Sequence, residues 1–201
     1  MRADYISVAT WDILLSMIRE PYATALEVAL ATGMRIGDVV ALKPDQVRGD
    51  VIEYTAKKTG KRGRAKLPPA LAERLRKPMF ALGLWTFESV RDPAKHISRG
   101  IVWKNLKEAA KRLNLRENVA PHSARKTYAV DLFRKSDLET TRERLQHDRI
   151  STTMLYAFAD KLAEEHGKPQ HDENDLKEFA RAVALEVVDL LIAKKFFKKR
   201  T

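Results

Sequence analysis

The chain has 201 residues, with 38 Lys or Arg against 27 Asp or Glu, which gives a formal net charge of +11. This excess favours a polyanionic partner, such as nucleic acid or an anionic membrane surface, although basic composition alone does not choose between them. The absence of cysteine excludes disulfides and thiolate metal sites. No apolar run reaches the ~18 residues of a membrane span, and no signal peptide opens the chain. We therefore expect a cytoplasmic protein of one domain, with at most a small appendage.

Helical segments dominate the expected structure. Apolar residues at helical spacing predict helices, in chain order, at 11–19, 23–31, 36–42, 70–76, 101–113, 122–133, a segment that ends near 147, and 151–158. Gly33 is a plausible C-cap for the second helix, and Pro44 stops the third.

One hairpin interrupts these helices. Residues 51–55 are rich in β-branched side chains and predict a strand, Thr59 and Gly60 mark a turn, and 64–67 can return as the second strand. Residues 77–98 have little periodicity and are expected to form a loop or a short strand. The fold class is therefore expected to be mainly α with a small antiparallel β-sheet.

Six reactive or charged residues stand at informative spacings: Arg35, Lys58, His122, Arg125, His147 and Tyr156. His122 and Arg125 are three apart on a predicted helix, so both side chains leave the same face, close to its N-terminus. Arginine offers a planar fork that matches two phosphate oxygens. A tyrosine hydroxyl needs a base or cationic neighbours before it can attack. The set is suited to phosphoryl transfer without a metal.

The order of these residues resembles the tyrosine recombinases, the phage integrase group. The segment 32–39, Thr-Gly-Met-Arg-Ile-Gly-Asp-Val, is similar to the first box of that family, Thr-Gly-Leu-Arg-Ile-Ser-Glu-Leu. His122 and Arg125 match the second box, His-x-x-Arg, and the segment from Leu145-Gln146-His147 to Tyr156-Ala157 matches the third. Gln146, Ala124 and Asp38 depart from the usual Gly, Leu and Glu without removing a reactive group. The similarity covers about residues 6–160.

The resemblance implies the fold of a tyrosine recombinase catalytic domain and a specific mechanism. Tyr156 attacks a DNA phosphodiester, forms a 3′-phosphotyrosyl intermediate and releases a 5′-hydroxyl. Arg35 and Arg125 stabilise the transition state, His122 assists proton transfer, and His147 hydrogen-bonds the phosphate. Lys58, in the hairpin, protonates the leaving oxygen, with Lys57 and Lys61 as rival positions. The resemblance implies no cofactor or metal, and four protomers assembled on double-stranded DNA.

The hairpin and the tail carry further expectations. Lys57, Lys61, Arg62 and Arg64 belong to a basic block around the turn, which is expected to contact the DNA backbone. Residues 1–165 are expected to form the catalytic domain, and 166–201 a polar linker followed by an amphipathic helix. That helix either links protomers or packs on its own domain. The first box begins about thirty residues in, too early for the N-terminal core-binding domain that the family usually carries, so the sequence is expected to be either an isolated catalytic fragment or an unusually short recombinase.

Three other readings compete with a recombinase. They are a type IB topoisomerase-like enzyme, a DNA-binding relative without activity, and a basic membrane-surface or structural protein. His166, His171, Asp172 and Glu173 form a loose cluster that matches no zinc spacing, so no metal site is expected. The sequence indicates no partner for His96. The host is expected to be a bacterial, archaeal or phage-infected cell.

Overall fold

The computed structural model describes residues 3–135, with side chains as far as Leu132. The helices are α1 (Val8–Ser16), α2 (Tyr22–Thr32), α3 (Ile36–Val39), the 3-10 helix η1 (Pro44–Gln46), α4 (Pro69–Leu75), α5 (Pro78–Ala81), α6 (Arg99–Arg112) and α7 (Pro121–Lys135). The strands are β1 (Val47–Arg48), β2 (Val51–Thr55), β3 (Arg62–Lys66), β4 (Glu88–Ser89) and β5 (Asp92–His96). The expected fold class, mainly α with a small antiparallel β-sheet, is confirmed.

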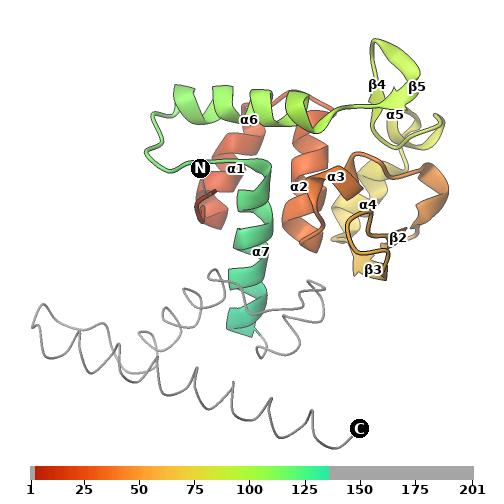
Figure 1. Ribbon diagram of the computed structural model, residues 1–201, viewed down its shortest axis with the longest axis horizontal. Coiled ribbons are helices and arrows are strands. Elements are labelled where there is room, and N and C mark those ends of the chain that lie inside the picture. The colour runs from red at the N-terminus through yellow and green to blue at the C-terminus, as the bar shows by residue number, and fades with distance from the viewer. Residues whose placement is uncertain (1–2, 136–201) are drawn as a thin grey trace, which may run out of the picture.

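Helix α2 lies at the centre of the molecule and contacts α1, α3, α6 and α7 (Figure 1). Its sequence is rich in alanine and has no strongly polar face, so neighbouring helices can approach it from several sides. Leu26 and Val28 are fully buried, and each such side chain contributes about 1.5–3 kcal/mol through its removal from water. The Glu27–Arg74 ion pair ties α4 to the same helix.

A polar contact fixes α7, which carries His122 and Arg125, against α1. The buried Trp11 indole donates to the Thr127 hydroxyl at 2.9 Å, and that hydroxyl donates to the Ile6 carbonyl at 2.6 Å. Helix α1 begins and ends three residues earlier than the predicted 11–19, because the Ser7 hydroxyl accepts the Thr10 N–H and caps it. Helix α2 matches the prediction to within one residue at each end.

The sheet is antiparallel in the order β1–β2–β3, with Tyr54 opposite Gly63. The predicted hairpin is confirmed, although β3 begins two residues earlier than expected and β1 was not predicted. Ala56 donates to the Lys61 carbonyl at 2.9 Å and closes the turn, in which Gly60 has φ 68°. That backbone region favours glycine. The turn thereby presents Lys57 and Lys58 beside α3.

Two other boundaries differ from the prediction. Helix α3 ends at Val39, not at residue 42, because Pro44 disfavours helical backbone at Lys43 and the Leu42 carbonyl accepts the Thr86 N–H at 2.9 Å. The segment 77–98, expected as a loop or short strand, forms α5 and the β4–β5 hairpin. This hairpin leads directly into α6 (Figure 1).

Within the described part of the chain, none of the helices combines the length and the hydrophobicity needed to cross a membrane.

Candidate active site

A cleft of about 590 Å³ lies where the boxes seen in the sequence meet. Four parts of the chain form it: the start of α3, the β2–β3 turn, the segment that joins β5 to α6, and the start of α7. The polar residues that line it are Arg35, Asp38, Lys57, Lys58, His96, Ser98, Arg99, His122 and Arg125. All four expected catalytic residues that the structure describes, Arg35, Lys58, His122 and Arg125, thus share one site.

Arg35 is placed by the tight turn between α2 and α3. The Thr32 hydroxyl donates to the Val28 carbonyl at 2.5 Å and accepts the Met34 N–H at 3.3 Å. Gly33 ends α2 in the left-handed conformation, with φ 67°, where a side chain would be strained. Arg35 then caps α3 through its carbonyl, which accepts the Asp38 and Val39 N–H groups. Local geometry therefore accounts for the Thr and Gly of the first box, and it places the Arg35 side chain at the cleft.

Arg125 joins the second box to the first. Its side chain is 5% exposed, and Nη1 donates to the Gly33 carbonyl at 2.6 Å. Burial, together with the positive charge of Arg35, lowers the pKa of Arg125 to about 10. The guanidinium is still charged at neutral pH. A positive group held in this way is ready to bind an anion without rearrangement.

His122 lies at the mouth of the cleft. The side chain is exposed, but protein atoms close around part of the ring. This partial burial lowers the pKa of His122 below 6.5, and the charges of Arg125, Lys126, Arg35 and Lys58 act in the same direction. The His122 imidazole therefore binds a proton more readily in the unfolded chain than in the folded protein. As a result, His122 lowers the free energy of unfolding as the pH falls below about 6.5.

The two adjacent lysines of the turn both line the cleft. Lys58 is near enough to His122 to lower its pKa, whereas the Lys57 N–H donates to Asp38 Oδ1 at 3.0 Å. Asp38 is buried, and this bond holds the start of the turn against α3. In the sequence, Asp38 stands out only as a departure from the family box, so this positioning role was not predicted.

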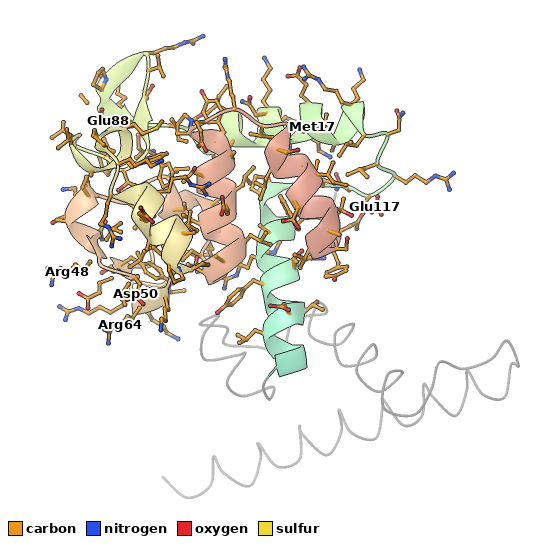
Figure 2. The ribbon with its side chains drawn as sticks, turned by 180° about the vertical axis from the view of Figure 1, so that it is seen from behind. Met17, Arg48, Asp50, Arg64, Glu88 and Glu117 are labelled. Atoms are coloured by element: carbon orange, nitrogen blue, oxygen red, sulfur yellow. The ribbon has the colours of Figure 1, made fainter. Side chains whose placement is uncertain are left out.

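Three of the four residues expected to bind DNA lie outside the cleft. Lys61, Arg62 and Arg64 are exposed along the turn and β3, and Arg64 Nε is 3.9 Å from Glu53 Oε1. Figure 2 shows Arg64 near Arg48 at the sheet end of the molecule. A pair as exposed as this contributes little to stability, so Arg64 can exchange Glu53 for a polyanion.

We expect removal of the Asp38 acceptor to misplace the turn. Asp38→Ala leaves the Lys57 N–H without its partner and should lower the rate of DNA cleavage about tenfold, since a lost hydrogen bond to a charged group costs about 1.5–3 kcal/mol. Asp38→Asn retains the oxygen acceptor and should keep most of the activity. Single-turnover cleavage at saturating protein measures both. An equal loss in the two variants would contradict a positioning role for this bond.

Part of the expected site lies outside the described residues. His147 and Tyr156 are there, as are the His166 and His171 cluster, the boundary expected at residue 165 and the C-terminal helix. Among residues 3–135, no three His, Asp or Glu side chains gather in a way that could hold a metal ion. His96, Ser98 and Arg99 line the cleft but were not expected to, because only the packing of the β4–β5 hairpin brings them there.

Comparison with known proteins supports the order of the boxes. The family model described as the phage integrase family matches residues 10–162. Tyrosine recombinase XerD of Staphylococcus saprophyticus is 28% identical over 149 residues, which cover 69% of this chain and 50% of that protein. Tyrosine recombinase XerD of Staphylococcus aureus strain Mu50 is 27% identical over 149 residues, which again cover 69% of this chain and 50% of that protein. The chain thus spans about half the length of the curated relatives that it matches.

Solved structures share the fold. The XerA recombinase superposes with a TM-score of 0.66 at 19% identity, over 85% of this chain and 67% of that one. The structure of lambda integrase residues 75–356 bound to DNA superposes with a TM-score of 0.63 at 18% identity, over 76% of this chain and 60% of that one. The catalytic domain of bacteriophage HP1 integrase gives 0.60 at 19% identity and is covered over 98% of its length.

Proposed function

Because this chain belongs to the phage integrase family, we propose that it is the catalytic part of a site-specific DNA recombinase. It would cleave and rejoin DNA through a 3′-phosphotyrosyl intermediate. The observation that carries the proposal is the meeting of Arg35, Lys58, His122 and Arg125, from three separate parts of the chain, in one cleft. The curated relatives XerD carry the name tyrosine recombinase, which agrees with this chemistry.

The cleft supplies what a phosphodiester needs at its transition state. Arg35 and Arg125, the second of them held by the Gly33 carbonyl, offer guanidinium groups for the two non-bridging oxygens, whose negative charge grows as the fifth bond forms. Loss of one such preorganised donor typically costs ~10²–10³-fold in rate. His122 has a lowered pKa and is mostly neutral at pH 7, so it can accept or relay a proton.

Tyr156 and Lys58 complete the proposed reaction. The Tyr156 hydroxyl gives its proton to a neighbouring base, for which neutral His122 is the proposed acceptor, and its oxygen bonds to phosphorus. The bond from phosphorus to the 5′-oxygen breaks as Lys58 gives a proton to that oxygen. His147 would hydrogen-bond the phosphate. Rejoining runs the same steps in reverse with a 5′-hydroxyl of another strand. The phosphotyrosyl bond retains the energy of the broken linkage, so the sequence of steps balances without a nucleotide.

The DNA backbone is the proposed partner of Lys57, Lys61, Arg62 and Arg64. Wild-type affinity for duplex DNA should fall steeply with salt, because phosphate contacts release counterions. The double variant Arg62→Ala, Arg64→Ala should reduce the slope of log affinity against log salt by about 1–2. Fluorescence anisotropy titrations measure this slope.

Arg116→Ala is the matched control for the salt experiment. Arg116 is exposed in the loop between α6 and α7. Its chain neighbour Glu117 lies at the opposite end of the described structure from Arg64 (Figure 2). We expect removal of the Arg116 side chain to leave the slope unchanged. Equal slopes for the double variant and the wild type would show that β3 does not lie along the DNA.

We also propose the domain arrangement that the sequence indicates. Residues 1–165 would be the catalytic domain, and the helix within 166–201 would link protomers of a tetramer on DNA, in the cytoplasm of the host cell. Deletion of 172–201 should then leave strand cleavage intact and reduce recombination between two sites. Loss of cooperative melting in the deletion variant would instead assign that helix to its own domain.

Trapping on a suicide substrate tests the proposed function. The substrate is duplex DNA nicked close to the cleavage position, so that the released fragment diffuses away and rejoining is blocked. Wild-type protein should form a covalent adduct that survives denaturation, and paired intact sites should give recombinant products. DNA relaxation without exchange would favour a type IB topoisomerase-like enzyme. Binding without any adduct would overturn the proposal in favour of a protein that only binds DNA.

A further inference from the structure

His96 has no part in the proposed chemistry, yet it lines the same cleft. It stands at the end of β5, directly before the segment that enters α6. Its half-buried ring packs edge to face against Trp85, with ring centroids 5.0 Å apart. This packing and the β4–β5 pairing hold the His96 ring in one orientation relative to the cleft.

The geometry determines which nitrogen of His96 carries the hydrogen. Nδ1 lies 2.7 Å from the Ile97 carbonyl oxygen, and a carbonyl can only accept. Nδ1 must therefore carry hydrogen, and in the neutral ring Nε2 presents a lone pair. A lone pair repels a phosphate oxygen. Only the protonated imidazole offers an Nε2–H that can donate to a phosphate.

The surroundings of His96 are mostly cationic. Charged groups on the packed elements are Lys43 (5.8 Å from the Trp85 ring), Arg35, Lys57, Lys58, Arg99, His122 and Arg125, with Asp38 and Glu88 as acids. Both acids are already engaged, Asp38 by the Lys57 N–H and Glu88 by the Leu84 N–H at 2.7 Å. Glu88 lies opposite His96 in the hairpin. The cations around His96 outnumber these acids, so a bound anion would favour the protonated imidazole.

We propose that His96 is a proton-linked ligand for a backbone phosphate of bound DNA. The ring takes up a proton as the DNA enters, and Nε2–H then donates to a phosphate oxygen while Nδ1–H keeps its bond to Ile97. An imidazole is suited to this, since it changes charge between about pH 5 and 8. The inference rests on the proposed function for the identity of its anion, and it adds a pH-dependent contact to that function.

The test is the affinity of the full chain for a fluorescent duplex of mixed sequence at pH 6 and pH 8, at constant ionic strength. Phosphate contacts do not depend on sequence, so the target site need not be known. Wild-type protein should bind about fivefold or more tightly at the lower pH. His96→Asn places an amide donor where Nδ1 stands and removes the Nε2 contact. His96→Gln extends an amide donor towards the Nε2 position at every pH.

Both His96 variants should lose most of the pH dependence, and His96→Gln should bind more tightly than the wild type at pH 8. His122→Gln is the control for the other imidazole that the described part of the chain brings to the cleft, and it should keep the dependence. Equal affinity of the wild type at the two pH values would overturn the inference, whatever the variants do. So would a pH dependence that persists in both His96 variants. Neither result affects adduct formation on the suicide substrate, which separately tests the proposed function.

Discussion

Tyr156→Phe is expected to abolish the covalent adduct with a suicide substrate while leaving the affinity for duplex DNA unchanged. The substitution removes one oxygen, the proposed nucleophile, and keeps the ring, so binding through the basic surface should persist. Adduct yield on a denaturing gel and anisotropy titrations measure the two properties. The expectation depends on the third sequence box, because Tyr156 lies outside the described residues.

Tyr54→Phe provides the matched control. Tyr54 lies on β2, half-buried near Arg125, so it is another phenol close to the proposed site. Burial raises the pKa of Tyr54 above 10, against the opposing charge of Arg125, and its hydroxyl stays protonated at neutral pH. We expect Tyr54→Phe to form the adduct. If Tyr54→Phe lost the adduct and Tyr156→Phe kept it, the nucleophile would be Tyr54 and the proposed assignment would be wrong.

Local signals made much of the fold predictable. The apolar spacing of α2 and the glycine after it are visible in the sequence, and the structure keeps both. The boundaries that differ depend on contacts between distant residues or on caps. Helix α3 ends early where Leu42 meets Thr86, more than forty residues later in the chain. The β4–β5 hairpin is short and carries Pro93, so neither strand shows a pattern strong enough to predict.

The candidate site was predictable where a residue type and its spacing carry the chemistry. Arg35, His122 and Arg125 were found in this way, and the structure brings them together with Lys58. Asp38 and His96 were not assigned roles, because their roles depend on geometry. Asp38 accepts a hydrogen bond from a backbone N–H 19 positions away in the sequence. The His96 ring is oriented by the Ile97 carbonyl and the Trp85 indole. No side-chain pattern in the sequence indicates such partners.

The positive charges in the cleft lower the free energy of unfolding, and bound DNA would offset this loss. Arg125 is buried with its charge and lies near Arg35, and both facts lower its pKa. Without an anion, the like charges repel one another across the cleft. A bound phosphate reverses this balance, so DNA should raise the melting temperature of the protein as well as occupy its site.

Lys58→Ala should lower the cleavage rate by ~10²-fold or more, the lower end of general acid catalysis. Lys58 is the preferred acid because its charge acts on His122, whereas the backbone of Lys57 is held by Asp38. A substrate with sulfur in place of the bridging 5′-oxygen has a better leaving group and needs no proton. It should therefore restore cleavage by Lys58→Ala to nearly the wild-type rate. Lys57→Ala is the adjacent control, since Lys57 lines the same cleft, and it should lose DNA affinity without a sulfur-dependent rescue. Rescue of Lys57→Ala in place of Lys58→Ala would move the general acid one residue along the turn and leave the rest of the mechanism unchanged.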